Sequence, residues 1–200
     1  MSRVARRTPG AVPSGLTLTS RRLVLRPLAA GDAPFLLQLM NDPDYYAHIG
    51  DRGLRSIEDA ADYVERVVAA SYRQHGYGMY LALRHSDGCP VGIAGLVNRP
   101  TLEDVDIGFA IAAAHRGAGY ATESAEAVLV HAARDFGLDR IVGVVSPGNA
   151  ASIRVLEKLG LRYEGRVRLA SEEAPIRLYA RDLRAGPEGP VSRDSVSWPA

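Results

Sequence analysis

Hydrophobic and polar residues alternate with two different periods along the chain, and the change of period divides it into strands and helices. A period of two, or a short unbroken apolar run, predicts strands over residues 18–26, 79–84, 90–98, 104–112, 140–145, 162–169 and 175–183. A period of three to four predicts helices that begin at Asp32, at Ser56, at Ala121 and just after Asn149. This order of elements predicts an α+β (mixed α/β) domain built on a single central sheet.

Two of the expected helices carry clear signals at their ends. The turn Asn41-Asp42-Pro43 is expected to end the first helix, because proline does not continue a helix and the residue before it avoids helical dihedral angles. Ser56 and Asp59 form a shortened capping box that is expected to open the second helix.

The strand expected over residues 104–112 has two very different faces. One face is apolar and consists of Val105, Ile107, Phe109 and Ile111. The other face begins with carboxylates and continues with residues that have almost no side chain, namely Asp104, Asp106, Gly108, Ala110 and Ala112. Such a face leaves room for something other than protein side chains to lie against the strand. The alternative is an ordinary solvent-facing surface made of small residues.

Composition and charge narrow the class of protein. The chain has 200 residues, a formal net charge of +1 and 46% hydrophobic residues, which predicts one domain and gives no reason to expect nucleic-acid binding. The domain is expected over residues 16–183, with flexible tails over 1–15 and 184–200. The single cysteine, Cys89, excludes an internal disulfide and a zinc site built from several thiolates. We find neither a signal peptide nor a membrane-spanning run, so we expect a cytoplasmic protein.

A glycine-containing turn joins the strand over 104–112 to the helix that follows it. Gly117 and Gly119 let the backbone approach a ligand closely. The N-terminus of the helix favours an anion such as a pyrophosphate, and Arg116 adds a positive charge. Thr122 stands where the dinucleotide-binding fingerprint needs glycine or alanine, and the Walker A pattern is also missing. The turn is compatible with phosphate without being a standard nucleotide loop; the alternative is a tight connection that binds no ligand.

Three motifs, at residues 22–27, 116–121 and 149–161, resemble motifs of the GNAT N-acetyltransferase superfamily and occur in the order found there. Residues 116–121 (RGAGYA) match its acetyl-CoA signature, Gln/Arg-x-x-Gly-x-Gly/Ala. Residues 149–161 are similar to its second signature, in which Asn-x-x-Ser/Ala precedes Lys-x-Gly-Phe. Residues 22–27 (RLVLRP) resemble the opening strand of the ribosomal-protein (RimJ/RimL-type) branch. The resemblance covers about residues 18–183.

The resemblance implies a fold, a donor and a reaction. The fold is one mixed, mostly antiparallel sheet with helices on both faces, in which two splayed parallel strands, here 104–112 and 140–145, form the cleft for coenzyme A. The donor is acetyl-CoA, and its acetyl group passes directly to a protein or peptide N-terminal α-amine or to a small amine. The implied cofactor contacts are Phe109, Ala110, Ile111, Arg116, Gly117, Ala118, Gly119, Tyr120, Ala121, Thr122, Asn149 and Ser152. The alternative is a catalytically idle GNAT-fold protein that binds acyl-CoA as a sensor or interaction module.

An amine must lose a proton before it attacks a thioester, so a base is required, directly or through water. Asp106 is the first candidate, because an acid just before an Ile-Gly-aromatic run serves as base in many family members. Asp104 follows, and Glu103 and Glu123 are weaker candidates. The alternative is that Asp106 neutralises a nearby arginine or binds the cation of the acceptor.

The leaving thiolate needs an acid, and much of the superfamily uses a tyrosine where this chain has Leu156. Ser152 is then the nearest hydroxyl, and we assign it a partial role in catalysis or in contact with coenzyme A. The alternative is an early-helix residue that bonds only to the backbone. Tyr120 is expected to pack rather than to react, and Cys89 is not needed as a nucleophile.

The resemblance places the acceptor groove beside Asn41–Arg55 and His75–Tyr80, where several tyrosines and His48 would set specificity. The alternative is that some of these tyrosines belong to the core. The histidines show no metal-ligand spacing, so we expect no metal. We expect neither a membrane nor a nucleic acid as partner. A homodimer is compatible with the sequence, which decides neither the oligomeric state nor the acceptor amine.

Overall fold

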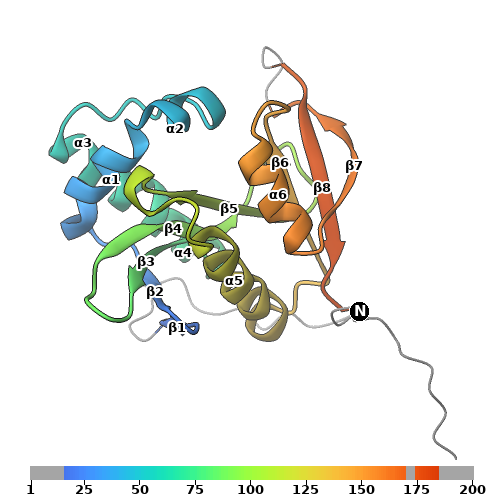
Figure 1. The fold of residues 1–200 in the computed structure, drawn as a ribbon, viewed down its shortest axis with the longest axis horizontal. Helices are drawn as coiled ribbons and strands as arrows, with labels where there is room; N and C mark the ends of the chain where they lie inside the picture. Colours follow the sequence, from blue (N-terminus) through green and yellow to red (C-terminus); the bar gives the residue numbers. More distant parts are fainter. Residues whose placement is uncertain (1–15, 170–173, 185–200) are drawn as a thin grey trace, which may run out of the picture.

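The structure is a computed structural model that describes residues 16–169 and 174–184. Its strands form one sheet in the order β1-β2-β3-β4-β5-β6-β8-β7 (Figure 1). The strands are β1 (Leu18–Thr19), β2 (Leu23–Pro27), β3 (Met79–Arg84), β4 (Pro90–Val97), β5 (Asp106–Ile111), β6 (Arg140–Val145), β7 (Arg162–Val167) and β8 (Ile176–Asp182). Neighbouring strands are antiparallel except β5 and β6, which are parallel. The predicted α+β fold is confirmed; apart from Arg184, the predicted tails lie outside the described residues.

Helices cover both faces of this sheet, as predicted. They are α1 (Ala33–Met40), α2 (Pro43–His48), α3 (Ile57–Tyr63), α4 (Ala69–His75), α5 (Tyr120–Phe136) and α6 (Ala150–Lys158). Figure 1 shows α5 and α6 in front of the sheet and α4 behind it. A π-helical segment over Val64–Val68 joins α3 to α4, so the helix expected from Ser56 is one continuous element. No helix in the described ranges is both long and apolar enough to cross a bilayer.

The short helix α2 was not predicted from the sequence. The turn at Asp42 does end α1, but it also begins α2: Oδ1 of Asp42 accepts hydrogen bonds from the N–H groups of Asp44 (3.0 Å) and Tyr45 (3.3 Å). Pro43 occupies the first helical position, where its missing N–H costs nothing. A cap and a proline at this spacing are a helix-start signal, which we interpreted only as a helix stop.

The first predicted strand is also divided in two. The turn between β1 and β2 is closed by Ser20, whose N–H donates to the carbonyl of Leu23 at 2.9 Å and whose Oγ accepts from the N–H of Leu23 at 3.1 Å. A side chain that satisfies the backbone in this way offers an alternative to the strand ladder. The turn brings Arg22 beside the N-terminus of α5.

The long helix α5 anchors the site because its apolar stripe is buried against the sheet. Ala125, Val128, Leu129 and Ala132 recur at the spacing of three to four residues from which the sequence predicts this helix, and each is at most 3% exposed. Gly137 ends the helix with a left-handed φ of +63°, a conformation that glycine adopts at low cost. With its stripe fixed, α5 holds its N-terminus next to the end of β5.

Candidate active site

The parallel strands β5 and β6 are joined at one end and separate toward the other. Their register pairs Asp106 with Val142, and the N–H of Val142 donates to the carbonyl of Val105 at 3.0 Å. In a regular parallel ladder the next hydrogen bond would join the N–H of Val144 to a backbone carbonyl of β5. Instead it donates to Oδ1 of Asp106 at 3.3 Å, so a side chain takes over the pairing where the strands diverge. We call this junction the fork.

Beyond the fork, β5 presents backbone groups to the space between the strands. Successive peptide groups of a strand point to opposite sides. The carbonyl of Val105 faces β6, whereas the N–H of Ala112 faces β4 and donates to the carbonyl of Val91 at 3.0 Å. By this alternation the peptide groups of Phe109 and Ile111 face β6. They lie at the level where the two strands have separated, so a ligand can pair with them.

A cleft of about 420 Å³ occupies this space. Its walls include every predicted cofactor residue except Ala118: Phe109, Ala110, Ile111, Arg116, Gly117, Gly119, Tyr120, Ala121, Thr122, Asn149 and Ser152. These residues come from β5, from the turn before α5 and from the start of α6. The structure therefore brings two distant sequence motifs together in one cleft of a size usual for ligand sites.

The turn before α5 leaves backbone donors free at one end of the cleft. Gly117 and Gly119 have φ values of +77° and +84°, which side chains other than glycine adopt at a cost. Gly119 is the N-cap of α5 and makes no side-chain cap, so the N–H groups of the first helical turn keep no intrahelical partner. No atom lies within 4 Å of a Cβ built on Gly117. This open end suits an anionic group.

The first turn of α5 is supported from behind by the turn between β1 and β2. Glu123 accepts hydrogen bonds from Ser20 Oγ (2.8 Å) and from the N–H (2.6 Å) and Nε (2.7 Å) of Arg22. The guanidinium of Arg22 lies 4.6 Å from the ring centroid of Tyr120, which packs as predicted. Burial raises the pKa of Glu123, but the hydrogen bonds from Ser20 and Arg22 outweigh it and hold the pKa below its usual value. Glu123 is thus placed to fix the helix rather than to accept a proton.

Arg116 lies at the wall of the cleft, but its side chain is already bound. Its Nε donates to the carbonyl of Ile111 at 3.1 Å. Its Nη1 and Nη2 form ion pairs with Asp44 (2.5 Å) and Asp42 (2.6 Å) of the neighbouring α2 segment. The positive charge that the sequence assigned to a phosphate is therefore paired with two carboxylates in this structure.

Asn149 and Ser152 stand at the start of α6, on the opposite wall. Oδ1 of Asn149 accepts a hydrogen bond from the N–H of Ser152 at 3.0 Å, so Asn149 caps the helix. The side-chain amide of Asn149 keeps its N–H donors for the cleft that it lines. Ser152 lies in the cleft wall. Its bond to Asn149 uses its backbone N–H and not its hydroxyl, so this bond does not support the alternative of a side chain that bonds only to the backbone.

Two basic residues of α6 were missed. Arg154 and Lys158 line the same cleft, one helical turn apart. They give α6 a positive edge that faces the space next to the glycine turn. The sequence shows two basic residues four positions apart, the first of them five positions after Asn149. Without the strand order, nothing showed that this edge faces the cleft.

Asp106 does not lie on an open face of β5. Its side chain is 2% exposed, its Oδ2 accepts a 2.6 Å bond from Nε of Arg99, and its Oδ1 holds the fork. It is not among the residues that line the cleft. The expected half-polar face is therefore wrong at this position, because Arg99 from the loop before β5 covers the carboxylate. Arg99 is the arginine that the alternative role of Asp106 requires.

Burial nevertheless raises the pKa of Asp106 to about 6, against the opposing effects of Arg99 and Val144. A general base that acts near neutral pH needs a pKa in this range.

This pKa predicts a pH-dependent stability. Between about pH 7.5 and pH 5, the wild type should gain about 1.4 kcal/mol of unfolding free energy relative to Asp106→Asn. The folded carboxyl, with its pKa near 6, takes up a proton in this range, whereas the unfolded carboxyl, with a pKa near 3.8, does not. Protons therefore favour the folded state as the pH falls. Urea unfolding of both proteins at the two pH values measures the difference, and a difference that does not change with pH would contradict it.

Only some of the residues that the sequence assigned to an acceptor groove border the cleft. Tyr45 and His48 of α2 line the cleft. Tyr46 instead bonds to Asn41 Oδ1 at 2.9 Å. Tyr77 and Tyr80 are 7% and 0% exposed, so they belong to the core. The alternative that some of these tyrosines are core residues is correct for this pair, and also for Tyr45, which is 6% exposed although it borders the cleft.

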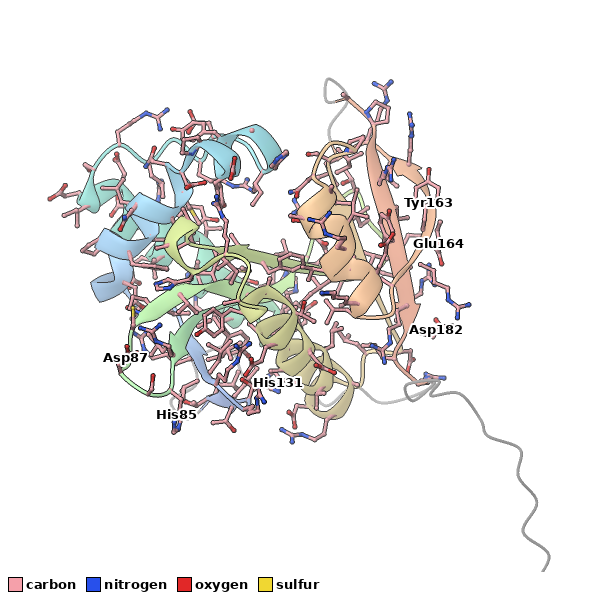
Figure 2. All side chains as sticks on the ribbon, in the orientation of Figure 1. His85, Asp87, His131, Tyr163, Glu164 and Asp182 are labelled. Carbon is pink, nitrogen blue, oxygen red and sulfur yellow. The ribbon has the colours of Figure 1, made fainter. Side chains whose placement is uncertain are left out.

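The remaining surface clusters lie away from the cleft. Figure 2 shows His85 and Asp87 on the hairpin between β3 and β4, and Tyr163 and Glu164 on the outer strand β7. None of these four residues lines the cleft. Within the part of the chain that the structure describes, no three His, Cys, Asp or Glu side chains gather as they would around a metal ion.

Comparison with known proteins agrees with this architecture. Residues 22–162 match the family described as "Acetyltransferase (GNAT) domain". The chain is 30% identical over 163 residues to YjcK of Bacillus subtilis, described as a probable N-acetyltransferase, covering 74% of this chain and 84% of YjcK. An acetyltransferase structure from Agrobacterium tumefaciens has a TM-score of 0.72 at 26% identity, over 84% of this chain and 95% of that one.

The structural neighbours also include the ribosomal L7/L12 alpha-N-protein acetyltransferase RimL, solved in complex with coenzyme A. Its TM-score is 0.64 at 22% identity, over 86% of this chain and 98% of that one. The family model covers more than half of the chain, and the class of protein is therefore an acyltransferase. The chain belongs to the GNAT acetyltransferase family.

Proposed function

We propose that this protein transfers the acetyl group of acetyl-CoA directly to a primary amine, in the cleft between β5 and β6. The observation that carries the proposal is the convergence of both signature motifs on that one cleft. The acceptor is a peptide N-terminal α-amine or a small amine. The neighbour RimL, named as an alpha-N-protein acetyltransferase, favours the peptide.

The residues present fit acetyl-CoA. The pyrophosphate would rest on the backbone N–H groups of residues 117–122, where the glycine turn leaves open space. The pantetheine arm would pair with the peptide group of Phe109, which faces the separated strand β6. Arg154 and Lys158 would add positive charge for the phosphates of the nucleotide end. When bound, acetyl-CoA supplies a thioester that an uncharged amine can attack.

Groups of the protein itself accept and donate protons and stabilise the charge that develops during the reaction. Asp106 takes the proton from the acceptor amine through a water molecule, since its carboxylate is covered and lies outside the cleft wall. The N–H of Ile111 stabilises the negative charge that develops on the carbonyl oxygen. As the new C–N bond forms and the C–S bond breaks, Ser152 assists protonation of the leaving sulfur. No covalent bond to the protein is required.

Replacing Ser152 with alanine is expected to lower the turnover number by about 10- to 100-fold, the lower part of the range for acid–base groups. The affinity for acetyl-CoA should change less, because the backbone N–H of Ser152 still bonds to Asn149. Steady-state kinetics and calorimetry separate the two effects. Ser152→Thr keeps a hydroxyl and should keep most of the turnover. An unchanged turnover number in Ser152→Ala would leave Ser152 with a structural role only.

Leu156 bears on the alternative of a catalytically idle protein. It stands where much of the family has a tyrosine, and it is 2% exposed. Its Cδ2 would lie 2.6 Å from a Cβ on Gly143, so Leu156 fills space that the missing side chain of β6 opens. Leu156 is therefore a core residue without an acidic group, and the acid function must come from another residue or be absent.

The decisive experiment is release of free coenzyme A thiol from acetyl-CoA in the presence of an amine panel. The panel should contain peptides with different N-terminal residues and several small amines. We expect thiol release that depends on the amine and exceeds the enzyme concentration many times over. Acetyl-CoA binding without release for any amine would favour the sensor or interaction module.

A further inference from the structure

Arg116 connects the glycine turn to α2. Its guanidinium bonds to Asp42 at 2.6 Å and to Asp44 at 2.5 Å, while its Nε holds the carbonyl of Ile111. The two carboxylates lie more than seventy residues before Arg116 in the chain, separated by 74 and 72 positions. The contact therefore joins two parts of the fold that have no local reason to meet.

The segment that provides these carboxylates forms part of the cleft wall. Asp44, Tyr45 and His48 of α2 line the cleft. On the side of β6, the carbonyl of His48 accepts a 2.9 Å hydrogen bond from Oγ of Ser146. Thus α2 lies across the open end of the fork, held to the β5 side by Arg116 and to the β6 side by Ser146.

The ion pairs of Arg116 are accessible to a competing anion. The side chain of Arg116 is 37% exposed and that of Asp44 is 67% exposed. Arg116 directly precedes the turn whose free N–H groups suit a phosphate. A guanidinium can bind a phosphate through two parallel hydrogen bonds, as it can bind a carboxylate.

We infer that Asp42 and Asp44 compete with a phosphate of the cofactor for Arg116 and so set the affinity for acetyl-CoA. This inference rests on the proposed function. When the phosphate binds, Arg116 exchanges its carboxylate partners for phosphate oxygens. The ion pairs that join α2 to the β5 side of the cleft are then broken. The hydrogen bond from Ser146 to the carbonyl of His48 still joins α2 to the β6 side. Asp42 and Asp44 thereby act as positioning residues through Arg116.

The test removes the two negative charges and keeps the shapes. In Asp42→Asn/Asp44→Asn, the amide oxygen at position 42 still caps α2, because asparagine is as good an N-cap as aspartate. Freed from its competitors, Arg116 should bind the phosphate more readily. We expect about three- to tenfold tighter binding of acetyl-CoA by calorimetry, given the usual strength of exposed ion pairs.

Two further measurements assign the effect to Arg116 and to phosphate. Acetyl-pantetheine has the same thioester end but no phosphates, so its affinity should be the same for the wild type and the double variant. In an Arg116→Ala background the two Asp→Asn changes should no longer alter the affinity for acetyl-CoA. A gain that persists without Arg116 would mean that the carboxylates repel the cofactor directly, which would overturn the inference.

A control variant matches the change in charge elsewhere on the molecule. Glu164 pairs with Arg140, and Asp182 lies 3.8 Å from the same guanidinium, so these two carboxylates also share one arginine. They belong to the edge strand β7 and to its neighbour β8 (Figure 2), and neither lines the cleft. Glu164→Gln/Asp182→Asn should therefore leave the acetyl-CoA affinity unchanged.

The possible results separate this inference from the proposed function. Tighter binding in the double variant, confined to acetyl-CoA and dependent on Arg116, supports the competition. Unchanged or weaker binding in the double variant, with normal binding by the wild type, overturns the competition and leaves the proposed function standing. Failure of the wild type to bind acetyl-CoA at all would overturn both.

Discussion

Replacing Gly119 with valine is expected to lower the affinity for acetyl-CoA by about 100-fold or more, the loss expected when two hydrogen bonds to a charged group are broken. Gly119 has a φ of +84°, which a β-branched residue avoids, so the turn must shift. A new Cβ would also lie 3.4 Å from Nη2 of Arg22. Both effects displace the N–H groups of the turn from the positions where they would meet the pyrophosphate.

The matched control is Gly137→Val at the other end of the same helix. Gly137 also has a left-handed φ, +63°, and no atom lies within 4 Å of a Cβ built there. Valine should cost about 1–3 kcal/mol of backbone strain at either position, so both variants should remain folded and lose similar stability. Calorimetry should show normal acetyl-CoA binding for Gly137→Val only. Equal affinities for wild type and Gly119→Val would show that the phosphate site is elsewhere.

Replacing Asp106 with asparagine is expected to lower the turnover number at neutral pH by about 10²- to 10⁴-fold, the usual contribution of a general base. With the pKa of Asp106 near 6, the wild-type rate should rise as the pH increases through about 6 and then level off. The variant should lack this inflection. Its rate should recover partly at high pH, where more of the acceptor amine is already uncharged.

Two controls separate the loss of a general base from a structural change at the junction of β5 and β6. The amide oxygen of Asp106→Asn can still accept the bond from Val144, so a pure base role leaves the acetyl-CoA affinity unchanged, whereas a fork that opens would weaken it. Asp104 is paired with Arg140 at 2.9 Å, and Asp104→Asn should keep most of the turnover. Near-wild-type turnover of Asp106→Asn from pH 6 to 9 would leave Asp106 as the partner of Arg99 alone.

The structural features around the cleft that the sequence predicts depend on local signals. The stripe of α5 and the glycine turn before it are set by residues close together in the chain, and Gly119 marks a backbone conformation that few other residues adopt. Once both signature motifs were found, the strand order that brings Asn149 opposite the glycine turn followed from the resemblance. Periodicity alone would not have paired β5 with β6.

The parts that were missed depend on contacts between distant segments. Asp106 looks exposed by alternation, but Arg99 reaches it from a loop whose course no periodicity describes. The helix α2 is only 6 residues long, too short for an apolar stripe, and its contacts with Arg116 join residues 72 and 74 positions apart in the chain. Arg154 has a visible spacing to the next basic residue, yet only the packed structure shows that this side of α6 faces the cleft.

The most direct test of the account follows the acetyl group itself. Full-length protein, acetyl-CoA and the best amine of the panel are mixed for less than one turnover and for many turnovers, and acceptor and protein are both analysed by mass spectrometry. Direct transfer predicts one acetyl group on the acceptor amine for each thiol released, and none on the protein, Cys89 included. An acetylated protein that later passes the group on, or thiol release without any acetylated amine, would contradict the account.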